Sequence, residues 1–441
     1  MLTAMLAGYI ALLLLVAWYI KRRLGFLVTA RGALLGWIWI VCGPPHVYYW
    51  LTGRLSELTF FRITVAFSLM WVGFIVGMEL TRLITPRQFR RAERVARLWR
   101  SMSVAPGYIP KMRLAALATA GLAFMLWVMV TEHQIGNLIT FIRLQGQTYD
   151  VAVFRSTMGG SRLYAYNLFL ASIAPFISML LLLRPAPQLK IYTILRYGFI
   201  VATLVGKATL FNRSAMALFL VELIAVKALL GDNRITVMRV ARGVLVVMLM
   251  VLPFFYHYRA DMSIFLALFF DRIWMTLYDG MVPYFRYFPD VVPFAMGRNF
   301  RVINLVLYGG ADYTPPMVAF AQAAGNYLGV FNAGFIAEAW ADFGYAGAFF
   351  VSAILGVSAA LADLAIFGDG VKTRESAAIL VCVVYGVLQI SATAAQTAMF
   401  SGGFALIPLL AAFLKMTQPR PRRAPDQGAT PGSLTESPVP S

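Results

Sequence analysis

Long apolar segments are the feature that most limits how this chain can fold. Of its 441 residues, 60% are hydrophobic and 13% are charged, whereas about a quarter of the residues in a soluble globular domain are charged. A segment of about 20 apolar residues can cross a bilayer as a helix that satisfies its own backbone hydrogen bonds. We therefore predict an all-α polytopic membrane protein with about 11 transmembrane helices (10–12). The predicted spans cover residues 2–20, 33–52, 60–80, 112–131, 163–183, 190–206, 210–230, 243–258, 343–366, 376–396 and 403–416.

Two of these spans have unusual sequences. In the first span the cations follow the apolar residues instead of preceding them, which is the reverse of a signal peptide. We therefore predict an uncleaved span with its N-terminus outside. The second span contains Pro44 and Pro45 in "CGPPHVYYW", and a helix break is expected there because proline lacks the backbone N–H.

The distribution of lysine and arginine predicts the topology. With the N-terminus outside, the odd-numbered connections face inward and hold about two thirds of all Lys and Arg, as the positive-inside rule requires. Residues 1–416 then form a single transmembrane domain with large outer loops at about 132–162 and 257–342. The tail at 417–441 is rich in Pro, Ser and Gly, and we expect it to be disordered and cytoplasmic.

An amphipathic basic helix is predicted on the inner side at 86–101. In "FRRAERVARLWR" an apolar face formed by Phe89, Ala92, Ala96 and Trp99 lies opposite several arginines. Such a helix lies on anionic lipid headgroups. A role as a topology anchor alone fits these residues equally well.

Cations on the predicted outer side depart from the orientation rule. Lys207 and Arg213 lie where two spans meet with almost no loop between them, and a cation at that depth is costly unless it is paired or faces water. They either snorkel to lipid phosphate or form an anion site. Guanidinium groups bind phosphate oxygens in a bidentate manner, so several of them beside a lysine are suited to a diphosphate. Further outer candidates are Arg259, Arg272 and Arg298.

The second outer loop also carries aromatic residues and carboxylates. "WMTLYDGMVPYFRYFPD" contains Trp274, Tyr278 and Tyr284, and aromatic rings of this kind stack on sugars. Glu338 and Asp342 lie four residues apart in "FNAGFIAEAWADFGYAGAFF", which puts them on one face of a helix. They either pair with the outer arginines or supply a general base, with Asp279 as a further candidate.

Other chemistry is not indicated. The sequence contains no GxxxxGK[ST] or HExxH motif, and its three histidines and two cysteines are scattered. We therefore predict no metal, no cofactor and no nucleic-acid partner.

Two segments resemble a known family. "GKATLFNRSAM" and "AEAWADFGYAGAFF", separated by a large outer loop, are similar to segments of the bacterial oligosaccharide repeat-unit polymerases, the O-antigen polymerase (Wzy) group. The resemblance implies a GT-C-like helical bundle in the bacterial inner membrane. It implies transfer of a growing glycan from undecaprenyl diphosphate to the terminal sugar of an incoming lipid-linked unit, at the periplasmic face. A chain-length regulator is a further possible partner.

Alternative functions remain open at this stage. An O-antigen ligase would carry a histidine in the outer loop, and His257 lies at the edge of that loop without a surrounding pattern. A transporter or lipid flippase would favour charges at the bilayer midplane and paired repeats, and the sequence shows no repeat. A membrane scaffold without enzymatic activity is less consistent with the excess of outer arginines.

Overall fold

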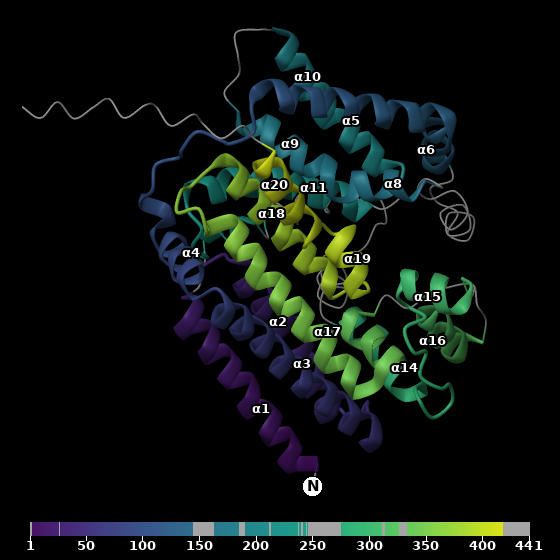
Figure 1. Cartoon of the computed structure of the whole chain (residues 1–441). Coiled ribbons are helices and arrows are strands. Elements are labelled where there is room, and N and C mark those ends of the chain that lie inside the picture. Colours follow the sequence, from purple (N-terminus) through teal and green to yellow (C-terminus); the bar gives the residue numbers. More distant parts are fainter. Residues whose placement is uncertain are drawn as a thin grey trace, which may run out of the picture.

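The structure is a computed structural model whose described part is built almost entirely of helices (Figure 1). The two β-bridges in this part, Leu27–Arg234 and Val104–Lys372, are isolated pairs. The predicted all-helical class is therefore confirmed for this part of the chain. The residues described are 2–25, 27–143, 163–184, 190–210, 213–236, 238–239, 241–243, 245, 275–310, 314–325 and 333–417.

Six of the described helices are long and apolar enough to cross a membrane. Other predicted spans correspond to helices that are shorter or less apolar, namely α2 (Ala30–Leu51), α11 (Arg213–Gly231), α18 (Arg374–Ile390) and α20 (Leu406–Met416). The predicted span at 243–258 lies almost wholly outside the described residues, so the total of eleven stays a prediction. The six are α1 with η1 (Leu2–Leu24), α3 (Glu57–Ile84), α5 (Lys111–Thr131), α8 with η3 and α9 (Tyr164–Leu183), α10 (Lys190–Ala208) and α17 (Phe335–Phe367).

The expected break in the second span is wrong. Helix α2 runs without interruption from Ala30 to Leu51, with Pro44 and Pro45 inside it. Two prolines remove two backbone N–H donors, but a helix packed among other helices can tolerate this loss. Pro45 is buried against the rest of the bundle.

Helices α3 and α17 form the most closely packed pair of the bundle (Figure 1). Glycines on both helices allow this approach. A Cβ atom added at Gly73 would lie 2.5 Å from the carbonyl oxygen of Phe349, and one added at Gly77 or Gly356 would meet backbone of the other helix even more closely. Small residues at such a contact let two membrane helices pack backbone to backbone.

The two ends of the bundle differ in the contacts they hold. One end, here called the basic end, contains η1 (Ile20–Leu24), α4 (Pro86–Leu98) and the start of α18. There a buried ion pair joins Arg31 to Asp363 at 2.6 Å, and another joins Arg184 to Glu375 at 3.0 Å. Both ion pairs involve arginines that were predicted on the inner side.

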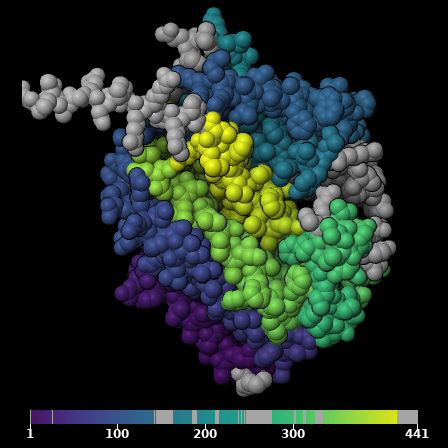
Figure 2. Space-filling view, viewed as in Figure 1, coloured from purple at the N-terminus to yellow at the C-terminus, as the bar shows by residue number. Residues whose placement is uncertain are grey.

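The opposite end, here called the loop end, carries the short helices of the second predicted outer loop. Figure 2 shows them as a lobe (green) beside α17. Of these, α14 and α16 pack on α17, and α14 also packs on α2 and α3. The lobe consists of α14 (Thr276–Tyr287), α15 (Arg301–Tyr308) and α16 (Pro315–Ala324), and α19 (Ala395–Phe400) also packs on α17.

Candidate functional site

Helix α17 is broken at Gly344, and this break shapes the candidate site. Gly344 has φ 61° and ψ −139° inside an otherwise helical run, a conformation that side chains of L-residues rarely adopt. The ring of Phe294 fills the space where a Cβ atom of Gly344 would lie. Glu338 and Asp342 therefore lie on a short segment before the break, at the mouth of the membrane helix.

The break frees backbone carbonyls that a neighbouring loop then uses. The carbonyl oxygens of Ala341 and Asp342 accept hydrogen bonds from the backbone N–H groups of Ala295 (2.9 Å) and Met296 (3.0 Å). A helix end leaves its last carbonyls without intrahelical partners, so the loop between α14 and α15 satisfies them. This pairing fixes the loop across the end of the short segment.

Both predicted carboxylates contact this loop, and we call Glu338, Asp342 and Asn299 the carboxylate cluster. Asp342 Oδ1 accepts the backbone N–H of Gly297 at 3.1 Å and that of Asn299 at 3.3 Å. Asn299 Nδ2 donates to Glu338 Oε2, and Gln396 Nε2 of α19 donates to the Asn299 carbonyl. Asp342 is completely buried, while Glu338 keeps 6% of its surface exposed. Glu338 therefore keeps slightly more exposed surface than Asp342, whose Oδ2 has no hydrogen-bond partner among the described residues.

The same loop carries a cation. Arg298 lies between Gly297 and Asn299 in sequence, and its guanidinium carbon lies 4.8 Å from the ring centroid of Tyr308. Both side chains line a pocket of about 150 Å³ in the lobe. The loop thus holds Asp342 through its backbone, while the exposed Arg298 side chain lies against Tyr308, and no described ion pair joins it to Glu338 or Asp342.

A second, aromatic hollow lies at the break. It has a volume of about 370 Å³ and is lined by Trp340, Tyr345, Phe61 and Arg62 among others. Arg62 donates to Asp290 Oδ1 at 2.7 Å, and this hydrogen bond lowers the pKa of Asp290. Aromatic side chains around one cation form a surface suited to a polar ligand with apolar faces, such as a sugar.

Both predicted sugar-contacting tyrosines are buried. Tyr278 and Tyr284 both have 0% of their surface exposed. Tyr278 Oη lies 2.6 Å from His46 Nδ1, and His46 Nε2 lies 2.8 Å from Thr64. Burial raises the pKa of Tyr284 well above its usual range, and the Glu338 carboxylate raises it further. Tyr284 is therefore a neighbour of the carboxylate cluster, whereas Tyr278 belongs to a separate polar group around His46.

Asp279 joins that second group. It accepts a hydrogen bond from the hydroxyl of Tyr49, and Arg54 lies 5.4 Å from the ring centroid of Tyr49. Its described contacts are thus with α2, and none reaches Glu338 or Asp342.

Lys207 is placed between helices α10, α11 and α18. Its ammonium group lies 5.8 Å from the ring centroid of Phe219 and 5.9 Å from that of Tyr385, and it interacts electrostatically with Glu222. Only 2% of its surface is exposed. A carboxylate and two aromatic rings thus surround this cation, and its described contacts include no member of the carboxylate cluster.

The remaining predicted site residues lie wholly or partly outside the described residues. Arg213 begins helix α11, but its side chain is outside the described part, as are Arg259, Arg272 and Trp274 in full. The predicted convergence of these cations with Lys207 on one anion therefore stays a prediction.

The sequence did not single out Asn299 and Gln396, which connect the loop to Glu338 and to α19. Both are neutral amides, and amide side chains are common in loops of every kind. The sequence offered only the nearby glycine, Gly297, as a sign of a turn, and the structure gives this residue a φ of +91°.

No family model, curated protein or solved structure matches this chain. Its function must therefore be inferred from the arrangement of its own residues.

Proposed function

We propose that the chain is a membrane glycosyltransferase that extends a lipid-linked glycan, as the resemblance to repeat-unit polymerases implies. The donor is a glycan on undecaprenyl diphosphate, and the acceptor is the terminal sugar of another lipid-linked unit. The single observation that carries the proposal is the Glu338 carboxylate. It lies at the mouth of a membrane helix, nearly buried, beneath a loop that holds an arginine.

Glu338 is assigned the role of general base. In the transfer, the bond between the anomeric carbon of the donor and the diphosphate oxygen breaks, and the diphosphate leaves with the electron pair. A new bond forms from that carbon to the acceptor hydroxyl oxygen, and the hydroxyl proton passes to Glu338. The hydrogen bond from Asn299 holds the carboxylate, and a base must be held within hydrogen-bond reach of the proton it takes.

Arg298 is assigned to the diphosphate. Its guanidinium is exposed, and cations placed where the leaving group gains charge lower the barrier to its departure. Asp342 positions this arginine, because its carboxylate binds the backbone on both sides of Arg298. Arg213, whose side chain lies outside the described part, remains a candidate for a further contact with the lipid diphosphate, whereas Lys207 is enclosed by Glu222 and two aromatic rings.

The first test replaces Glu338 by Gln and Arg298 by Gln. Glu338→Gln keeps the size of the side chain and removes the carboxylate, whereas Arg298→Gln shortens the side chain and removes the guanidinium. We expect each to reduce the rate of polymerisation by about 100-fold or more, the usual contribution of a general base or of a charge-stabilising group. The readout is the ladder of glycan chain lengths formed by the purified full chain in proteoliposomes from lipid-linked repeat units.

Matched controls exist at the same end of the molecule. Glu57 and Arg286 are both exposed and lie outside the cluster, so Glu57→Gln and Arg286→Gln should give a normal ladder. A normal ladder from Glu338→Gln would refute its role as base. Transport of the labelled unit across the vesicle by the unaltered chain, without any lengthening, would instead favour a flippase.

A further inference from the structure

The basic end contains a cationic pocket that the proposed reaction does not use. Its volume is about 380 Å³, and the described residues of its lining include Arg22, Arg23, Arg97 and Arg234 and no Asp or Glu. All four arginines are exposed. Four guanidinium groups around one hollow repel each other unless an anion lies between them.

The fold brings these arginines together from three distant segments. Helix η1 supplies two of them and ends at Gly25, whose φ is 60°. The chain then pairs with the segment after α11, through the bridge Leu27–Arg234 and a hydrogen bond from Val28 N to the Asn233 carbonyl (2.7 Å). Helix α4 adds Arg97. The convergence is therefore built by backbone contacts and does not depend on the arginine side chains.

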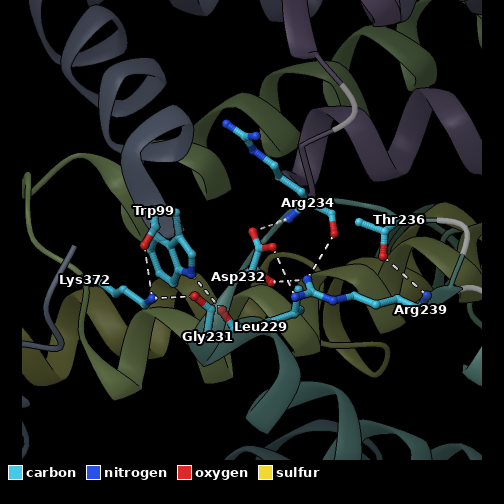
Figure 3. Close-up of polar contacts among 8 residues, drawn as sticks. All are labelled: Trp99, Leu229, Gly231, Asp232, Arg234, Thr236, Arg239 and Lys372. Atoms are coloured by element: carbon cyan, nitrogen blue, oxygen red, sulfur yellow. Dashed lines mark hydrogen bonds and ion pairs between the residues drawn. The ribbon is translucent and has the colours of Figure 1, made fainter. Parts of the chain in front are cut away.

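The acid nearest in sequence to Arg234 is already engaged. Asp232 accepts hydrogen bonds from the guanidinium of Arg239 and from the backbone N–H of Arg234, both at 3.1 Å. Figure 3 shows the Arg234 guanidinium pointing away from Asp232. Among the described residues, no ion pair or hydrogen bond involves the side chain of Arg23, Arg97 or Arg234. These charges are available for a ligand.

An apolar groove continues directly from this pocket. It has a volume of about 540 Å³ and runs between α1 and α2, with Trp18, Ile20, Trp39 and Ile40 in its lining. Gly36 leaves it open, because a Cβ atom added there would meet no other atom within 4 Å. The groove and the pocket share the lining residues Leu24, Leu27 and Ile235.

We infer that the pocket and groove together bind one anionic phospholipid. Arginines bind phosphate oxygens, and the apolar groove beside them accommodates an acyl chain at the membrane surface. A free phosphate would use the pocket alone and leave the groove without a role. The site lies at the end of the bundle opposite the carboxylate cluster, because Arg31, seven residues beyond Leu24, pairs with Asp363 at the far end of α17. It is therefore separate from the proposed reaction centre.

The experiment measures lipid binding to the purified full chain by native mass spectrometry in detergent, with phosphatidylglycerol as the probe. One variant combines Arg23→Gln, Arg97→Gln and Arg234→Gln, and a second carries Gly36→Leu to fill the groove. We expect each variant to weaken binding of the tightest phosphatidylglycerol at least about tenfold. The triple variant removes basic residues, each of which adds substantially to attraction near a lipid surface. Gly36→Leu fills the groove that the acyl chain would occupy.

The controls remove the same charge or add the same bulk elsewhere. Arg87, Arg94 and Arg100 are exposed and lie outside the pocket, so their triple change to Gln should leave binding unchanged. Gly8 also has open space around it, so Gly8→Leu is the control for Gly36→Leu. Thermal melting of every variant verifies that it is folded.

Three outcomes would overturn the inference. Equal weakening by the control triple would mean that general surface charge attracts the lipid. Binding of phosphatidylcholine as tight as that of phosphatidylglycerol would mean that the arginines do not distinguish an anionic headgroup from a neutral one. Saturable displacement by inorganic phosphate, with no effect of Gly36→Leu, would mean that the site holds a free anion. None of these measurements depends on polymerase activity, so a failure of this inference would not refute the proposed function.

Discussion

At the scale of single residues, Glu338 and Asp342 lie one turn apart yet have different surroundings. Asp342 is fully buried and binds two backbone N–H groups of the loop, which is the pattern of a structural carboxylate. Glu338 has one amide partner and some exposure. Residue type alone assigns the same chemistry to both, and only the contacts separate a positioning residue from a candidate base.

This difference predicts that substitution of Asp342 lowers stability. Asp342→Ala leaves the N–H groups of Gly297 and Asn299 without an acceptor, so we expect a loss of about 1–3 kcal/mol in unfolding free energy. Asp342→Asn keeps a carbonyl oxygen in place and should lose less. Thermal melting in detergent measures both, with Glu338→Gln as the comparison. An unchanged melting temperature for Asp342→Ala would contradict the structural role.

Only part of this site could be predicted from the sequence. Two acids four residues apart on a helix are visible in any sequence, and so is an arginine in an outer loop. The partner Asn299 lies 39 residues from Glu338, and backbone N–H groups, which hold Asp342, have no signature in residue type. The interaction between Lys207 and Glu222 was also not predicted, because it depends on how α10 and α11 pack.

At the scale of elements, most helices could be predicted and their irregularities could not. The apolar runs correctly placed α1, α3 and α5, because length and hydropathy decide a membrane helix. The break at Gly344 lies inside such a run, where a glycine with positive φ looks like any other glycine. The prolines of α2 predicted a break that is absent, because packing against other helices offsets the local cost of proline.

The α3–α17 contact gives an element-scale prediction. Gly77→Leu puts a side chain where the backbone of Ala353 now lies, and overpacking of this kind costs about 1–3 kcal/mol or more. We expect a lower melting temperature and a smaller folded fraction on size exclusion after heating. Gly198→Leu on α10 is the control, because its Cβ position is open. Equal behaviour of the two variants would show that the two backbones do not pack this closely.

At the scale of the whole molecule, the structure separates two sets of residues that the charge pattern had already divided. Residues predicted on the inner side contact one another at the basic end, as Lys372 does with the carbonyls of Trp99 and Gly231 at 3.0 Å each (Figure 3). The lobe with the carboxylate cluster lies at the other end. The positive-inside rule predicts which of these two ends faces the cytosol.

That orientation can be tested with the cysteines the chain already has. Cys42 and Cys382 are buried, so a water-soluble, membrane-impermeant maleimide should leave the unaltered chain unlabelled. Arg286→Cys at the loop end should be labelled in intact spheroplasts, and Arg100→Cys at the basic end should be labelled only after the membrane is opened. Both positions are exposed, so access to the reagent differs only by side. Labelling of Arg100→Cys in intact spheroplasts would reverse the topology and move the carboxylate cluster to the cytosolic face, where a periplasmic polymerase could not use it.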